Sequence, residues 1–132
     1  MKLKIYTDGG SRGNPGPAAA GYVISDQNDQ LLEEGGLYLG VTTNNQAEYR
    51  AVKLALEKAS KYQPEHIDLY LDSELVVKQL MGLYKIKNVE LKPVIEDVKQ
   101  LLGRYDYTIQ HVRREYNQEA DRQVNIVLDQ QG

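Results

Sequence analysis

The 132-residue chain contains no cysteine, tryptophan or phenylalanine, and its ten tyrosines are its only aromatic residues. Without cysteine, the chain has neither a disulfide framework nor a thiolate metal site, which suits a reducing compartment. The first ten residues, MKLKIYTDGG, hold no apolar run long enough for a signal peptide or a membrane span. We therefore expect a soluble, cytoplasmic protein with no membrane partner.

A strong positive charge is also missing. The formal net charge is −3 at pH 7, which argues against a protein that coats nucleic acid with its whole surface. This charge still allows an enzyme that grips a few phosphates locally while holding a cluster of acids. Hydrophobic residues make up 41 % of the chain, and no repeat or linker divides it. We expect a single domain over residues 1–132, acting as a monomer.

The hydrophobic pattern predicts three strands followed by alternating helices and strands. A turn at 27–29 separates the second and third strands, and Thr43-Asn44-Asn45 marks the start of a long helix that Pro64 ends. The strands are expected at residues 2–8, 18–26, 31–41, 66–72 and 106–113, and the helices from about 43 to 62 and at 73–80, 91–103 and 117–129. This order is typical of an α/β fold, with a mixed sheet flanked by helices.

Two of the predicted strands end in an aspartate, in the matched segments IYTD (5–8) and LYLD (69–72). If these strands are parallel neighbours, Asp8 and Asp72 lie side by side at the carboxyl edge of the sheet, where open sheets bind ligands. Aspartates are also common turn formers, and Asp8 precedes two glycines. Taken singly, each aspartate therefore has an ordinary explanation.

Two further acids lie on or beside apolar helix faces. At about 100° per residue, Glu48 lies near the middle of the face formed by Ala51, Val52, Ala55, Leu56 and Ala59. An ionised carboxylate there is costly unless it is paired or binds a metal. Asp121 borders the apolar stripe of the last helix. The alternative for both is a solvated acid near the positive end of a helix.

Three or four carboxylates that converge repel each other and need a cation. Ligand sets made only of oxygen favour hard ions such as Mg²⁺ or Mn²⁺ over zinc. Two such ions about 4 Å apart are a known arrangement for in-line phosphoryl displacement.

Four stretches together resemble the ribonuclease H type 1 family: TDGGSRGNPGPA (7–18), TTNNQAEYRA (42–51), LDSELVVKQL (71–80) and NQEADRQVN (117–125). The resemblance covers nearly the whole chain. It implies the ribonuclease H-like fold, with a five-stranded mixed sheet of three antiparallel strands and two parallel additions. It also implies a nuclease that cuts the RNA strand of RNA–DNA hybrids and leaves 5′-phosphate and 3′-hydroxyl ends.

The resemblance assigns the catalytic and metal-binding roles to Asp8, Glu48, Asp72 and Asp121. It implies two Mg²⁺ ions, for which Mn²⁺ can substitute, with Asp8 bridging both. Glu48 and Asp72 would hold the ion on the leaving-group side, and Asp121 the ion that carries the attacking water.

The resemblance also implies a set of substrate-binding residues: Gly9, Gly10, Ser11, Gly13, Asn14, Thr43, Asn44 and Asn45. Ser11, Asn44 and the Gly13 backbone would contact the RNA strand, where the 2′-hydroxyl distinguishes RNA from DNA. Asn14, Thr43 and Asn45 would contact the DNA strand, and the glycines allow close approach of the backbone. Ordinary turn and helix-cap chemistry accounts for the same residue types.

Two features of many family members are missing. Residues 82–88 carry Lys85 and Lys87 but no dense basic run, and no histidine lies between Val112 and Asp121. We expect Arg113 or Arg114 to substitute in part for the histidine by contacting phosphate. These departures leave two hypotheses: a metal-dependent endoribonuclease, or a catalytically weak or inactive nucleic-acid-binding module.

Overall fold

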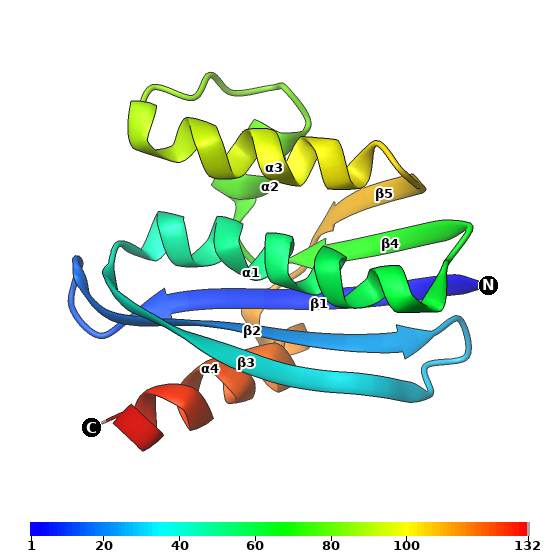
Figure 1. Cartoon of the computed structure of the whole chain (residues 1–132), viewed down its shortest axis with the longest axis horizontal. Helices are drawn as coiled ribbons and strands as arrows, with labels where there is room; N and C mark the ends of the chain where they lie inside the picture. Colours follow the sequence, from blue (N-terminus) through cyan, green and yellow to red (C-terminus); the bar gives the residue numbers. More distant parts are fainter. Residues whose placement is uncertain (132) are drawn as a thin grey trace.

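The computed structural model describes residues 1–131, in which five strands form one sheet (Figure 1). The strands are β1 (Lys2–Ser11), β2 (Gly16–Asp26), β3 (Leu31–Thr42), β4 (His66–Leu71) and β5 (Asp106–His111). Their order across the sheet is β3-β2-β1-β4-β5. The first three strands pair antiparallel, whereas β4 runs parallel to β1 and β5 runs parallel to β4. The predicted mixed sheet is therefore confirmed, with β1 and β4 as parallel neighbours.

Helices cover both faces of the sheet. The α-helices of the described residues are α1 (Asn44–Ala59), α2 (Glu74–Leu80), α3 (Lys92–Leu102) and α4 (Gln118–Gln131). Short 3₁₀ turns occur at η1 (Ser60–Tyr62), η2 (Val89–Leu91) and η3 (Arg114–Tyr116). Figure 1 shows α1 and α3 on one side of the sheet and α4 on the other, beneath β2 and β3. Within residues 1–131, no helix combines the length and apolar character that crossing a membrane requires.

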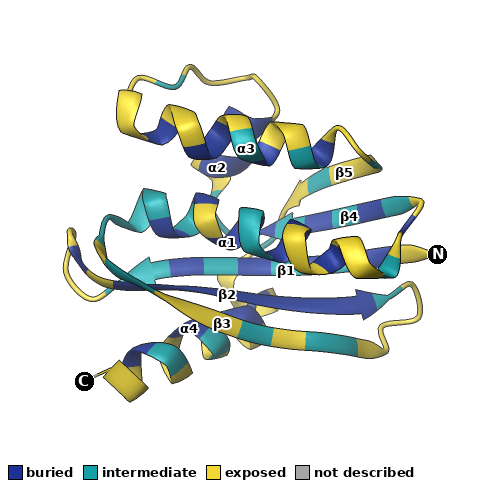
Figure 2. Ribbon diagram, viewed as in Figure 1, coloured by how far each residue is buried: buried dark blue, intermediate teal, exposed yellow. Residues whose placement is uncertain are grey.

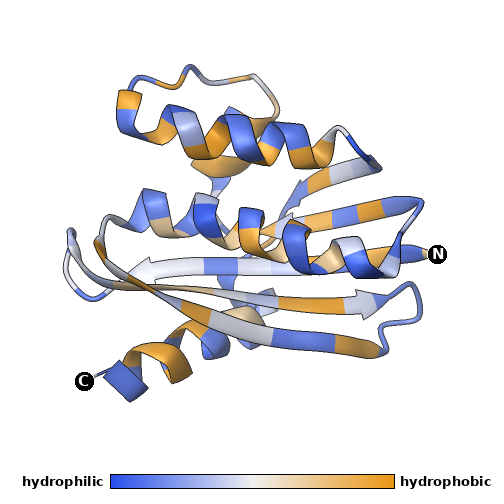
Figure 3. Cartoon of the chain, viewed as in Figure 1, coloured by the Kyte–Doolittle hydropathy of each residue, from blue (hydrophilic) through white to orange (hydrophobic). Residues whose placement is uncertain are grey.

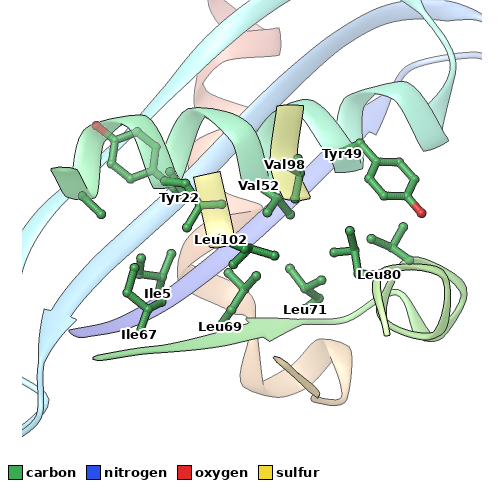
Figure 4. Packing of buried hydrophobic residues seen from close by; sticks show 14 of the residues in the cluster. Ile5, Tyr22, Tyr49, Val52, Ile67, Leu69, Leu71, Leu80, Val98 and Leu102 are labelled. Carbon is green, nitrogen blue, oxygen red and sulfur yellow. The ribbon is translucent and has the colours of Figure 1, made fainter. Parts of the chain in front are cut away.

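The main core lies between the sheet and the layer formed by α1, α2 and α3. Alternate residues of β1 and β4 are buried, and β2 is buried along most of its length because helices cover both of its faces (Figure 2). In Figure 3, hydrophobic and hydrophilic residues alternate around α1, α3 and α4, as expected for helices with one buried face. Figure 4 shows the side chains that meet in this core, among them Ile5, Val52, Ile67, Leu69, Leu71, Val98 and Leu102. Burial of each such side chain stabilises the fold by about 1.5–3 kcal/mol.

Local signals explain where the helices begin. The hydroxyl of Thr43 accepts a hydrogen bond from the Gln46 backbone N–H at the start of α1, and Ser73 does the same for Val76 at the start of α2. Each hydroxyl satisfies one N–H group that has no partner inside its helix. The predicted apolar stripe of α1 is buried as expected: Ala51, Val52, Ala55, Leu56 and Ala59.

Several element ends differ from the prediction. β1 does not end at Asp8 but continues to Ser11, because residues 9–11 still pair with Ala18–Ala20 of β2. The long helix tightens into η1 after Ala59, and β5 ends at His111 rather than at residue 113. The helix predicted from residue 91 begins at Lys92 after η2, and α4 continues to Gln131. These ends depend on contacts between distant segments, which periodicity does not report.

Candidate active site

The four acids that the sequence singled out meet in one place. Asp8 and Asp72 each follow the last pair of the parallel β1–β4 ladder, which joins Thr7 to Leu71. Glu48 lies one turn into α1, and Asp121 lies in the first turn of α4. All four carboxylates line a single surface pocket of about 280 Å³. Four segments that are distant in the sequence thus bring four acids to one edge of the sheet.

The surroundings disfavour the charged form of two of these acids. Burial, together with the neighbouring Asp72, Asp121 and Glu48, raises the pKa of Asp8 to about 8. The pKa of Glu48 is raised to about 7, because burial and the charge of Asp72 outweigh the opposing effects of Ser73 and the Arg114 guanidinium. Carboxyl groups with raised pKa values that share a pocket are typical of functional sites.

The residues fit a hard divalent cation. The Oε2 atom of Glu48 is buried and has no hydrogen-bond partner among residues 1–131. A buried carboxylate oxygen without a donor is costly, and a bound cation removes that cost. No three His, Cys, Asp or Glu side chains in that part of the chain stand close enough to form a ready coordination shell. The fit therefore rests on the all-oxygen ligand set, the shared pocket and the unpartnered Glu48 oxygen.

Half of the expected substrate-binding residues lie beside the acids. Gly9, Gly10, Ser11 and Asn44 line the same pocket as the four carboxylates. The backbone N–H and hydroxyl of Ser11 donate to Asn44 Oδ1 at 2.9 and 3.0 Å. A side chain at position 9 would overlap the backbone of Ala47, so β1 and α1 approach this closely because residue 9 is glycine.

The other four expected substrate-binding residues do not line this pocket. Asn14 accepts a hydrogen bond from the Asn44 backbone N–H at 3.0 Å, which ties the loop after β1 to the start of α1. Gly13 in that loop has a φ of 98°, a conformation that favours glycine. Thr43 serves as the cap of α1. Asn45 lines a different pocket of about 560 Å³, together with Lys85 and Lys87. Asn45 therefore lies beside Lys85 and Lys87 and does not line the pocket of the four acids.

The pocket also contains residues that the sequence did not identify or left ambiguous. Of the two arginines considered, Arg114 lines the pocket, whereas Arg113 lies 3.7 Å from Glu115 in an exposed ion pair. Asn125 donates to the backbone O and the Oδ2 of Asp121 at 3.1 and 3.2 Å. The four-residue spacing of Asp121 and Asn125 places them on one helix face, a signal that could have identified Asn125. No sequence signal marked Arg12, which also lines the pocket.

Comparisons with known proteins agree with this architecture. Residues 6–127 match the family model described as reverse transcriptase-like. Ribonuclease HI of Halobacterium salinarum is 43 % identical over 129 residues, which are 97 % of this chain and 65 % of that relative. The chain therefore spans slightly less than two thirds of that relative's length.

Two solved structures match over nearly their whole length. The crystal structure of RNase H1 from Halobacterium salinarum gives a TM-score of 0.95 at 41 % identity and covers 98 % of this chain and 99 % of that one. LC11-RNase H1, isolated from compost and solved with an RNA/DNA hybrid, gives 0.93 at 39 % identity and covers 97 % of each chain. On these matches and on its fold, the chain belongs to the ribonuclease H type 1 family.

Proposed function

We propose that this chain is a metal-dependent endoribonuclease that hydrolyses the RNA strand of RNA–DNA hybrids to 5′-phosphate and 3′-hydroxyl products. The observation that carries the proposal is the meeting of Asp8, Glu48, Asp72 and Asp121 in one pocket with Ser11 and Asn44. A non-catalytic protein would gain nothing from the mutual repulsion of four acids. The hybrid bound to LC11-RNase H1, 39 % identical to this chain, supports the substrate class.

The four carboxylates would hold two Mg²⁺ ions, or Mn²⁺ in their place. When bound, such ions supply a water of lowered pKa and positive charge for the leaving oxygen. Asp8 takes the shared position in our assignment because its pKa responds to Asp72, Asp121 and Glu48 together. The pKa of Glu48 responds to Asp72 but not to Asp121, which supports placing Glu48 with Asp72 and Asp121 apart. As the family resemblance implies, Glu48 and Asp72 would hold the ion on the leaving-group side, and Asp121 the ion that carries the attacking water.

The pocket walls would select the substrate. The Ser11 hydroxyl, Asn44 and the Gly13 backbone would recognise 2′-hydroxyls of the RNA strand, since that group separates RNA from DNA. The rest of the substrate contacts would come from Gly9, Gly10, Asn14, Thr43 and Asn45. Lys85 and Lys87 lie in the pocket that contains Asn45, where their charge can attract the DNA backbone.

Arg114 gives the site a positive charge beside the acids. A guanidinium in this position can bind a phosphate oxygen through two N–H groups and stabilise the charge that builds up during hydrolysis. We propose this role for Arg114 in place of the missing loop histidine. We also propose that the protein acts as a monomer and is located in the cytoplasm.

A binding module is the second candidate. The sparse basic surface and the absence of a histidine between Val112 and Asp121 favour it. Under this reading the protein would bind the hybrid and leave both strands intact.

The deciding experiment is cleavage of an end-labelled RNA–DNA hybrid in Mg²⁺, Mn²⁺ or EDTA, beside matched RNA and DNA duplexes. We expect metal-dependent internal cuts in the hybrid's RNA strand alone, with 5′-phosphate on the new ends. Asp8→Asn should abolish cleavage, whereas Asp97→Asn, a matched change in the half-exposed Lys53–Asp97 ion pair, should leave it unchanged. Hybrid binding without cutting in either metal would establish the binding module instead.

A further inference from the structure

The segment that joins β5 to α4 is attached to the sheet directly beside two of the acids. Val112 N–H donates to the carbonyl of Leu71 at 2.9 Å, and Asn117 Nδ2 donates to the carbonyl of Thr7 at 2.8 Å. Leu71 and Thr7 are the residues immediately before Asp72 and Asp8. One connecting segment therefore fixes the backbone of both strands at the point where their acids leave the sheet.

Asn117 also holds the third element of the site. Its backbone carbonyl accepts the N–H of Asp121 at 3.1 Å, at the start of α4. The same residue thus joins the strand that carries Asp8 to the helix that carries Asp121. Its side chain is buried, with only 1 % of the residue exposed.

The amide oxygen of Asn117 supports a specific role for the amide N–H₂ group. Its Oδ1 atom is buried and has no hydrogen-bond partner among residues 1–131. An unpartnered buried acceptor destabilises a fold, and an apolar side chain of similar size would avoid that cost. The amide is thus tolerated at a position where its N–H₂ group makes the bond to Thr7.

The attachment of α4 gives this bond its importance. The buried cluster beneath α4 is small and consists of Ala19, Val124 and Leu128, with Val127 partly buried against it. The first turn of α4 also packs closely on β2, because a side chain at Gly21 would overlap the carbonyl of Ala120. Apolar contacts have little directionality, so the hydrogen bond from Asn117 to Thr7 adds a directional constraint that joins the start of α4 to β1.

We infer that Asn117 is a positioning residue, which sets the placement of Asp121 relative to Asp8 and so the affinity of the carboxylate pocket for divalent cations. The inference rests on the proposed function only for its effect on cleavage. Asn117 acts through these two acids and touches neither substrate nor the reacting atoms.

The test compares Asn117→Leu and Asn117→Ala with the parent, and with Ser25→Ala as the control. Ser25 is a buried polar residue of β2 that pairs with Lys4, away from the acids. Binding of Mn²⁺ is measured by calorimetry and by the rise in Tm that the ion causes. We expect both Asn117 variants to bind Mn²⁺ about 10–100-fold more weakly, the usual effect of losing a residue that orients metal ligands. Ser25→Ala should bind it as the parent does.

Hybrid cleavage gives the second measurement. We expect kcat at a fixed Mg²⁺ concentration to fall by a similar factor, KM for the hybrid to stay within about twofold, and higher Mg²⁺ to restore part of the rate. A lower Tm with unchanged Mn²⁺ affinity would show that Asn117 is merely structural and would overturn the inference. The Ala variant keeps the test open if the Leu variant does not fold.

The two proposals can fail separately. If the parent binds Mn²⁺ but does not cut the hybrid, the proposed activity is wrong, while the Mn²⁺ titrations still decide the role of Asn117. If the parent cuts the hybrid and both variants match its Mn²⁺ affinity and kcat, the positioning role is wrong. If the parent binds no Mn²⁺, both proposals are wrong.

Discussion

Replacing Asp8 by Asn should stabilise the protein in EDTA even though it abolishes cleavage. The folded protein holds the pKa of Asp8 at about 8 through burial and three neighbouring acids, against an ordinary value of 3.8. Folding therefore takes up a proton at neutral pH. A raised carboxyl pKa gives stability that is fully present below about pH 4 and is lost as the pH rises through about 8. Asn does not titrate, so the variant escapes this loss.

The size of the effect follows from the same pKa values. At pH 7 the unfolded carboxyl is ionised and the folded one is protonated, and the gap between pH 7 and the ordinary value of 3.8 is worth roughly 4 kcal/mol at about 1.4 kcal/mol per pH unit. Asn still buries a polar side chain, so we expect a net gain of about 2–4 kcal/mol. For a domain of this length, that gain raises the Tm by on the order of 10 °C.

Thermal unfolding in EDTA between pH 5 and 9 measures this directly, with Asp97→Asn as the surface control. The Tm of Asp8→Asn should exceed that of the parent by a margin that widens from pH 5 to pH 8. Saturating Mg²⁺ should raise the Tm of the parent more than that of the variant, because bound cation compensates the charge of Asp8. An Asp8→Asn variant that unfolds at or below the parent's Tm at pH 7, or a margin that does not change with pH, would refute this account of the site.

Three further predictions test other parts of the structure. Arg114→Ala should lower kcat about tenfold or more with little change in Tm, and Arg114→Lys should recover part of the lost rate. If Arg114→Ala has the same kcat as the parent, Arg114 does not bind phosphate during cleavage. Gly9→Ala should cost about 3 kcal/mol or more in urea unfolding, because the new methyl group overlaps the Ala47 backbone, and a loss below about 1 kcal/mol would contradict that packing. Burial opposes ionisation of Glu33, yet hydrogen bonds from Lys61 and two tyrosines lower its pKa to about 2, so Glu33→Gln should cost about 1–2 kcal/mol at pH 7. The difference in stability between the parent and Glu33→Gln should shrink as the pH falls from about 4.5 through 2. A difference that stays constant with pH would show that the Glu33 carboxylate is not stabilised in this way.

Local patterns were enough to predict the element types and the sheet. The 3.6-residue period of α1 correctly identified its buried face, and this is why Glu48 could be recognised as unusually placed. The strands before Asp8 and Asp72 are parallel neighbours, which was the condition for these two acids to lie side by side. The predicted end of β1 at Asp8 was wrong, because the last residues of this strand depend on pairing with β2, which no local signal reports.

The composition of the pocket was predictable only in part. The acids were identified because a carboxylate on an apolar face or at a strand end is chemically unusual, whereas Arg12 and Asn125 looked like ordinary surface residues. Their place in the pocket depends on how α4 docks against the sheet. Asn117 appeared in the sequence only as the first residue of the stretch NQEADRQVN, because its bond to Thr7 joins residues 110 positions apart. The catalytic and binding roles of individual residues stay predictions until the variants are measured.

The distribution of apolar contacts explains why positioning matters most at Asp121. Asp8, Glu48 and Asp72 come from elements that share the large core with α2 and α3, so folding itself places them. Asp121 comes from α4, whose buried cluster is much smaller and lies on the opposite face of the sheet. A small shift of α4 would move Asp121 relative to the other three acids, and in our proposal all four hold the cations. We therefore expect the directional hydrogen bond of Asn117 to have its greatest effect here, where the buried apolar cluster of the site is smallest.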